Sequence, residues 1–274
     1  MSRKIFALIG SVLNEEAALP AFLEAHAWAD DIIMLDSGST DNSAEVTRKY
    51  KRTLLHKPLE ANHNKRSAWA IQQTIADWVL FIDPDEFISA ELKKEILSIL
   101  EHGSEYVAFE LPRVNFFMNK PLRHGGWSGN GLKMFRRDKV RFEGDSYHER
   151  PIIDGKIGQL KGEVLHYPNP NIHWITQKFN FISEFDQKDY FDQYGELSEK
   201  KLRWLLFTKP FKNFWKSYIK KQGYKDGIHG LIYAAMIWAF DVIRICKYAE
   251  RYIVKNPDIL PADKLPDPWE CRKR

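Results

Sequence analysis

The fold class follows from the segment Trp78-Val79-Leu80-Phe81-Ile82-Asp83-Pro84-Asp85-Glu86. Its five consecutive apolar residues predict a strand buried on both faces, as in a parallel sheet. The acids that follow fall where an open parallel sheet binds ligands, beyond the carboxyl ends of its strands. The spacing of Asp83 and Asp85 is typical of carboxylates that hold a hard divalent ion together with substrate phosphates. The alternative is an acidic surface turn in which Glu86 is a helix-start charge.

Strand and helix patterns alternate through the first hundred or so residues. Apolar runs predict strands at 4–10, 31–35, 52–56 and 78–82, and helical spacing predicts helices at 15–28, 65–75 and 89–100. A capping box from Asn42 to Glu45 predicts one more helix start. This order predicts an α/β fold, with a mostly parallel sheet and helices on both faces. The second strand ends at Asp36, which places another acid at the same edge of the sheet.

Composition excludes several classes of protein. The 274 residues are 44% hydrophobic and 14% aromatic, which suits one globular domain with or without an appendage and excludes a disordered chain. The two cysteines, Cys246 and Cys271, do not form a disulfide framework, so we expect a reducing cytoplasm. The late uncharged run at 227–240 is shorter than the ~20 apolar residues that cross a bilayer, so we expect no membrane-spanning segment.

The second half of the chain has shorter and less regular secondary-structure patterns than the first half. Short strand-like pieces at 106–111 and 132–135 alternate with loops, and 172–194 has a helical pattern. We predict a catalytic domain at 1–199, with halves at 1–103 and 104–199, followed by a helical extension and tail at 200–274.

The extension at 200–255 is basic and aromatic. Thirteen Lys and Arg face three acids there, so the segment carries +10 and the rest of the chain −6. Seven aromatic residues are interleaved between Lys200 and Lys225, a pattern that suits either single-stranded nucleic acid or an anionic membrane. An apolar helical face follows, formed by Ile228, Leu231, Ile232, Ala235, Ala239, Val242 and Ile243. That face favours an interfacial helix on a membrane over nucleic acid, unless it packs on the catalytic domain.

Three motifs occur in order: Val12-Leu13-Asn14-Glu15-Glu16, then Asp36-Ser37-Gly38-Ser39-Thr40-Asp41, then the stretch from Asp77 to Glu86. With them the chain resembles family 2 glycosyltransferases of GT-A fold, and the bacterial branch that adds sugars to the lipopolysaccharide core, including β-1,4-glucosyltransferases. The resemblance covers the N-terminal hundred or so residues and continues more thinly to His166. It implies inverting, metal-dependent transfer of a hexose from a nucleotide-diphosphate sugar such as UDP-glucose.

For the donor, the resemblance implies that Asn14, Glu15, Asp36 and Ser37 line the nucleoside pocket. The ordinary alternatives are that Glu15 is a first-turn acid favoured by the helix dipole and that Asp36 begins a turn. Lys65 and Arg66 carry the positive charge that a diphosphate leaving group needs, unless they form a solvated helix start.

For the metal, the resemblance implies that Asp85 is a direct ligand of Mg²⁺ or Mn²⁺ and that Asp83 lies near the ribose and the ion. His166 is an additional candidate ligand, with a structural histidine as the alternative. Pro84 departs from the small residue that the family usually has between these acids.

For the acceptor, a base must take the proton of the attacking hydroxyl group. Glu149 and Asp145 are the candidates, and the resemblance favours Glu149 unless it pairs with Arg150. His148 can orient that carboxylate or a phosphate. Trp127, among small and polar neighbours, is a candidate for stacking on a sugar ring, with a core tryptophan as the alternative.

The whole pattern fits an enzyme at the inner face of the bacterial cytoplasmic membrane that acts on lipopolysaccharide core or another lipid-linked glycan. Two other functions compete with it. A nucleotidyltransferase would need a Gly-rich basic loop after the first strand, where residues 11–16 are acidic instead. A non-catalytic peripheral membrane protein would use the sheet only as a scaffold.

Overall fold

The computed structural model describes residues 3–56, 63–143, 151–169 and 171–256. The chain divides into two compact units, the first formed by residues 1–114 and 129–166 and the second by 115–128 and 167–274. This division differs from the predicted boundary at residue 199. The helix at 172–194 belongs to the second unit because its Tyr190 packs with Leu205, Ile245 and Tyr248 of the C-terminal helices.

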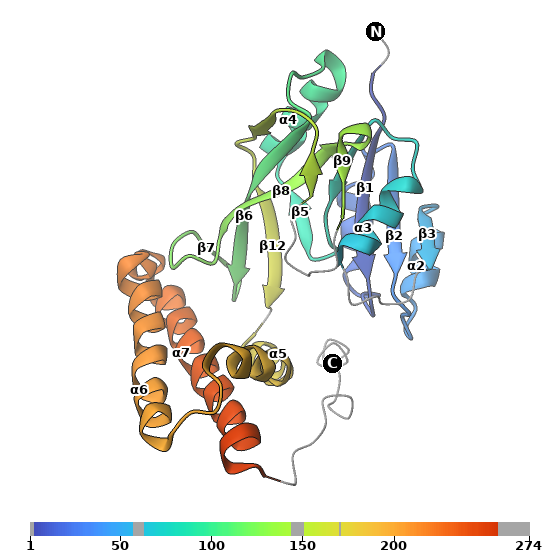
Figure 1. Ribbon diagram of the computed structural model, residues 1–274. Helices are drawn as coiled ribbons and strands as arrows, with labels where there is room; N and C mark the ends of the chain where they lie inside the picture. The colour runs from blue at the N-terminus through green and yellow to red at the C-terminus, as the bar shows by residue number, and fades with distance from the viewer. Residues whose placement is uncertain (1–2, 57–62, 144–150, 170, 257–274) are drawn as a thin grey trace. The chain divides into compact units, whose positions relative to one another are not determined.

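A large mixed sheet forms the centre of the first unit (Figure 1). Its strands are β1 (Phe6–Val12), β2 (Asp31–Asp36), β3 (Thr53–His56), β4 (Trp78–Phe81), β5 (Glu86–Ile88), β6 (Ala108–Phe117), β8 (Gly129–Arg136), β11 (Ile157–Gln159) and β12 (Val164–Asn169). The order is β3-β2-β1-β4-β8-β6-β12-β5, and β11 pairs with β6. Strands β3, β2, β1 and β4 are parallel, whereas β8 is antiparallel to both β4 and β6. A separate two-stranded sheet joins β9 (Val140–Arg141) to β10 (Ile152–Ile153), and a 3₁₀ turn, η1, covers Arg137–Lys139.

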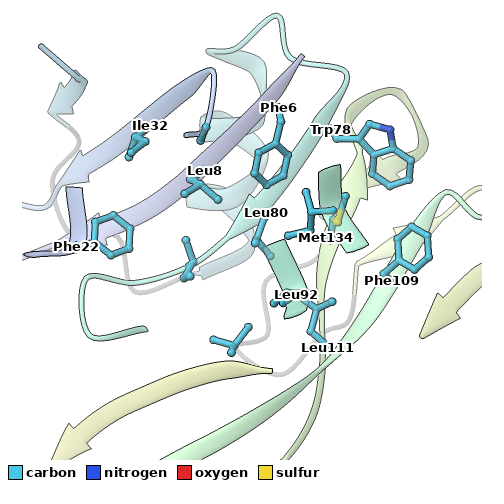
Figure 2. Packing of buried hydrophobic residues seen from close by; sticks show 14 of the residues in the cluster. Phe6, Leu8, Phe22, Ile32, Trp78, Leu80, Leu92, Phe109, Leu111 and Met134 are labelled. Carbon is cyan, nitrogen blue, oxygen red and sulfur yellow. The ribbon is translucent and has the colours of Figure 1, made fainter. Parts of the chain in front are cut away.

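Helices cover both faces of this sheet, as predicted. They are α1 (Leu19–Ala25), α2 (Ser43–Lys49), α3 (His63–Gln72) and α4 (Ala90–His102). Phe6 and Leu8 point to the face covered by α1 and α4, where Figure 2 shows them among Phe22, Leu80 and Leu92. The alternate residues of β1 point to the other face, against α3. The α/β fold class is therefore confirmed.

The N-terminal ends of two helices, α1 and α2, differ from the prediction. The helix predicted at 15–28 begins only at Leu19, with Pro20 in its first turn, and residues 15–18 form turns instead. Glu15 and Glu16 are therefore not first-turn acids. Asn42 precedes α2 but makes no side-chain capping bond, so the predicted capping box does not form.

The second unit is built from helices. They are α5 (Ile172–Tyr194), α6 (Glu199–Trp215) and α7 (Gly227–Ala249), with a π-helical turn η2 (Lys216–Lys220), a 3₁₀ turn η3 (Gly223–Asp226) and a π-helical turn η4 (Glu250–Val254). Strand β7 (Lys120–Leu122) pairs with the end of β6 in this unit. Ion pairs join α7 to α5, including Arg244 with Asp186 at 3.2 Å and Lys247 with Glu184.

The helical stretch Gly223–Val254 is 32 residues long and apolar enough to cross a membrane by length and composition alone. The helix is longer than the uncharged run at 227–240, because it continues past Asp241. Only 22% of its most apolar window is buried. The expectation of no membrane-spanning segment stays a prediction.

His26 shows how tightly the first unit is packed. Its side chain, in a residue only 1% exposed, has Nδ1 2.8 Å from the carbonyl oxygen of Phe22, and Nε2 accepts a hydrogen bond from the N–H of Ile88 at 3.2 Å. Burial lowers the pKa of His26 from 6.5 to about 4, and the charge of Lys93 acts in the same direction. The neutral imidazole therefore links α1 to β5.

We predict that His26 makes the folded protein sensitive to mild acid. The unfolded chain takes up a proton near pH 6.5, whereas the folded chain takes it up only near pH 4. The contribution of His26 to the free energy of unfolding is therefore fully present above pH 6.5. It falls by on the order of 3 kcal/mol as the pH drops to 4. Urea unfolding of wild type and His26→Gln across this range measures the difference. The exposed His102→Gln is the control, and identical pH slopes for all three proteins would contradict the prediction.

Candidate active site

Three chain segments meet at one edge of the sheet. Because β1 is parallel to both β2 and β4, the chain leaves all three strands in the same direction. Val12 pairs with Asp36, and Ile9 pairs with Phe81 two residues before Asp83. The motifs at 12–16, 36–41 and 83–86 are therefore brought together, as the sequence predicted.

Asn14 ties the first two motifs to each other. Its backbone has φ of 56°, a left-handed conformation that Asn tolerates better than most residues. Its Oδ1 accepts hydrogen bonds from the N–H of Thr40 at 2.8 Å and from the Thr40 hydroxyl at 3.2 Å, and its own N–H donates to Ser39 Oγ at 3.1 Å. These bonds fix the turn after β1 against the turn after β2.

Hydrogen bonds to the backbone fix Asp36, Glu15 and Glu16 in the two turns. Asp36 is 6% exposed, and its Oδ1 accepts from the N–H of Ser39 at 2.9 Å, so it does begin a turn. The N–H of Ser37 donates to the carbonyl oxygen of Val12 at 2.9 Å. Glu15 donates its N–H to Ser43 Oγ, and Glu16 accepts from the N–H of Asn42 at 2.8 Å. Their roles toward a nucleoside stay predictions.

A recess of about 230 Å³ opens beside these strand ends. Its polar lining includes Ser11, Arg66, Asp83 and Lys133. Arg66 Nη2 donates to Ser11 Oγ at 2.6 Å, and the N–H of Ser11 donates to Asp83 Oδ1 at 3.3 Å. Arg66 therefore faces the same recess as Asp83, whereas Lys65 is exposed on the first turn of α3.

Asp83 has an unusual protonation equilibrium. Protein atoms crowd its carboxyl group in the recess, and this burial, together with the negative charge of Glu86, raises the pKa of Asp83 to about 6. The residue as a whole still keeps an exposed surface, and its carboxyl group lines the recess.

Glu86 is a residue that the sequence interpretation missed. It is the first residue of β5 and 1% exposed, not a helix-start charge, because α4 begins at Ala90 behind a Ser89 cap. Its carboxylate pairs with Lys133 Nζ and lies 3.4 Å from Arg113 Nη1, and it also accepts the N–H of Asp83 at 3.2 Å. The fourth acid of the motif was visible in the sequence, but its two cationic partners come from β8 and β6.

Asp85 and His166 form the second part of the acidic site. Asp85 Oδ2 lies 3.7 Å from His166 Nε2, because the pairing of β12 with β5 sets His166 opposite Glu86. Across the four described ranges, no three His, Cys, Asp or Glu side chains gather closely enough to hold a metal ion. A carboxylate and an imidazole are nevertheless donors that fit a divalent cation whose remaining ligands are phosphates and water.

Several predicted residues lie elsewhere. Asp145, His148 and Glu149 lie outside the described residues. Trp127 belongs to the second unit, where its ring stacks on Tyr233 with centroids 4.7 Å apart and planes 8° apart. One face of Trp127 is therefore occupied while the residue stays half-buried, and its role in sugar stacking stays a prediction.

Comparison with known proteins shows the family. A model described as "Glycosyl transferase family 2" matches residues 8–151, more than half of the chain. The chain belongs to this family and is a glycosyltransferase, which confirms the resemblance found in the three motifs.

Relatives extend the match over the length of the chain. It is 25% identical to the lipopolysaccharide core biosynthesis glycosyltransferase LpsC of Rhizobium meliloti, over 89% of this chain and 91% of that protein. It is 27% identical to an uncharacterized glycosyltransferase of Rickettsia felis, over 89% and 88%. Among solved structures, glucosyl-3-phosphoglycerate synthase from Mycobacterium tuberculosis in complex with Mn²⁺ and UDP-glucose matches with a TM-score of 0.35 and 19% identity, over 41% of this chain and 44% of that one.

We predict that Glu86→Gln destabilises the first unit. The substitution leaves Lys133 and Arg113 without a neutralising charge, and breaking a largely buried ion pair costs about 3 kcal/mol. The double variant with Lys133→Met should cost less than the two single changes together, because one change already removes the pair. Urea unfolding checks both values, with the exposed Glu91→Gln as the control. Equal losses for Glu86→Gln and Glu91→Gln would contradict the assignment.

Proposed function

We propose that the chain transfers a hexose from a nucleotide-diphosphate sugar, UDP-glucose first among the donors, to a saccharide hydroxyl group with inversion. The observation that carries the proposal is the convergence of Asp83, Asp85 and Arg66 at the carboxyl edge of the parallel strands. This edge is where open α/β sheets bind nucleotides. Family membership favours sugar transfer over a nucleotidyltransferase or a non-catalytic scaffold.

The donor diphosphate is held by groups of opposite charge. Asp85 and His166 would hold Mg²⁺ or Mn²⁺, with Asp83 beside them, and the ion would neutralise charge on the departing nucleotide. Arg66 reaches the recess from α3 and adds a fixed positive charge, and Lys65 adds a second.

The nucleoside is held by the two tied turns. Asn14 and Glu15 lie on one turn and Asp36 and Ser37 on the other, so a ligand there meets a preformed surface. The hydrogen bonds between the turns support this role, because a rigid site loses less conformational freedom on binding.

On the acceptor side, Glu149 takes the proton of the attacking hydroxyl group, and Asp145 is the alternative base. The oxygen of that hydroxyl group forms the new bond to the anomeric carbon as the bond to the diphosphate breaks. His148 orients the base or the acceptor, and Trp127 stacks on a sugar ring.

The acceptor is the lipopolysaccharide core or another lipid-linked glycan at the inner face of the bacterial cytoplasmic membrane. The relative from Rhizobium meliloti supports this choice, since the two chains match over 89% and 91% of their lengths. An acceptor with a lipid anchor requires an enzyme that works at a membrane surface.

Asp85→Asn should abolish the cation-dependent binding of UDP. A ligand at 100 times its Kd stabilises the fold by about 2.7 kcal/mol, so Mn²⁺ with UDP raises the Tm of wild type. We expect this rise to vanish in Asp85→Asn and to shrink in His166→Ala, while the Tm without ligands stays near that of wild type.

The matched control is Asp138→Asn, which removes an exposed carboxylate on η1. It should respond to Mn²⁺ and UDP as wild type does. An undiminished response of Asp85→Asn would sink the metal assignment.

The two candidate bases are separated by kinetics. Removing a general base lowers kcat by about 10²–10⁴-fold. We expect this loss for Glu149→Gln, with donor binding retained in the thermal assay, and a small effect for Asp145→Asn. The opposite ranking assigns the base to Asp145, and two unaffected variants refute both assignments.

A further inference from the structure

The outer face of α6 carries four exposed aromatic side chains, which we call the aromatic stripe. Its members are Trp204, Phe207, Phe211 and Trp215, with exposures of 68%, 80%, 59% and 55%. At about 100° per residue, they fall within an arc of about 80° on the helix. The buried side of the same helix is formed by Leu205 and Pro210. Packing among the residues that the structure describes therefore does not explain the stripe.

The stripe is large for a protein surface. With about 200 Å² for a fully exposed aromatic side chain, it presents on the order of 500 Å² of ring surface. The largest apolar patch on a typical monomer is about 300–600 Å² and commonly marks a binding site. Helix α7 adds an exposed apolar face of its own, with Ile228, Leu231 and Trp238 at 61%, 37% and 44%.

Positive charge surrounds the stripe. Between residues 200 and 225 the chain has nine Lys and Arg and no acid. Eight of the nine are exposed: Lys200, Lys201, Arg203, Lys212, Lys216, Lys220, Lys221 and Lys225. The ninth, Lys209, lies over the ring of Tyr190 at 4.0 Å. Exposed rings among exposed cations match a membrane interface, where rings sit at headgroup level and cations meet anionic lipids.

We propose that the aromatic stripe docks α6 in the plane of an anionic bilayer. The four rings enter the boundary between headgroups and acyl chains, and the surrounding lysines contact lipid phosphates. A second copy of the chain is a poorer occupant, because it would bring the same dense positive charge to the contact.

The contacts of α7 favour this in-plane arrangement over a membrane span. Asp241 is 3% exposed and accepts from Asn213 Nδ2 of α6 at 2.6 Å. Arg244 and Lys247 of α7 pair with Asp186 and Glu184 of α5. A helix that left these partners to cross a bilayer would carry three charges into hydrocarbon, which is costly. The helices therefore stay packed and meet the membrane from one side.

Vesicle sedimentation tests the proposal. We expect wild type to bind vesicles of phosphatidylglycerol and phosphatidylethanolamine, to bind phosphatidylcholine vesicles at least tenfold more weakly, and to lose affinity as NaCl shortens the Debye length. A variant in which Ser replaces all four residues of the stripe should bind anionic vesicles at least tenfold more weakly. The triple change Lys212→Glu, Lys216→Glu and Lys220→Glu should have a similar effect.

Matched controls are placed in the first unit. One control variant removes exposed apolar side chains by the changes Ile75→Ser and Ile152→Ser. The other control variant changes the net charge by as much as the triple lysine variant does, through Arg48→Glu, Lys49→Glu and Lys94→Glu. Both control variants should bind vesicles as wild type does, and circular dichroism melting confirms that every variant folds.

Three results would overturn the proposal. The first is a stripe variant that binds anionic vesicles as tightly as wild type does. Loss of self-association by that variant, with vesicle binding unchanged, counts as the same result. The second is equal loss of binding in the control variants. The third is bound protein that resists extraction by alkaline carbonate, which would show a spanning helix. Binding is measured without donor or acceptor, so it is independent of whether the proposed sugar transfer occurs.

Discussion

The parallel pairing of β1 with β2 on one side and β4 on the other is the constraint that the site depends on. Alternate residues of β1 enter two separate cores, Phe6 and Leu8 on one face and Ala7 and Ile9 on the other. A register slip of one residue would exchange these faces. The cores therefore fix the register, and the register fixes where Asn14, Asp36 and Asp83 leave the sheet.

The acidic motif after β4 divides its charges between two tasks. Asp83 and Asp85 remain within reach of a ligand, whereas Glu86 turns back into the sheet and meets cations from β8 and β6. A buried carboxylate without partners would be strongly unfavourable, so Lys133 and Arg113 are needed to stabilise the carboxylate of Glu86. Glu86 also accepts a hydrogen bond from the N–H of Asp83, so this ion cluster holds the turn that carries Asp83 and Asp85.

The parts of the structure that depend on local pattern were predictable. Apolar runs located the four parallel strands β1 to β4 to within a few residues, and the positions of Asp36 and Asp83 after two of these strands predicted that both would lie at the same edge of the sheet. The contacts that depend on distant segments were not predictable. Nothing in the spacing of the sequence pairs Glu86 with Lys133, or Trp127 with Tyr233, because these partners lie 47 and more residues apart. Helix α1 began late for a local reason, since Pro20 suits a first turn.

Helix α7 shows a further limit of periodicity. The predicted apolar face was read from its hydrophobic residues, yet the most buried positions include Gly230 and Asp241. Asp241 is buried because Asn213 and Arg244 satisfy its carboxylate, and only the fold supplies the first of these partners. The helices of the second unit thus bury ion pairs beside a core of Tyr190, Leu205, Ile245 and Tyr248, whereas four aromatic side chains of α6 remain exposed.

The exposed rings of α6 and the ion pairs buried between α5 and α7 are not what water alone favours. In water, exposing the rings of α6 gains nothing, and burying ion pairs between α5 and α7 brings little net stability. Beside a bilayer, both features become favourable, because the rings leave water on docking and the ion pairs are already shielded from hydrocarbon. The same helices would then hold the enzyme at the surface where a lipid-linked acceptor is found, without any covalent anchor.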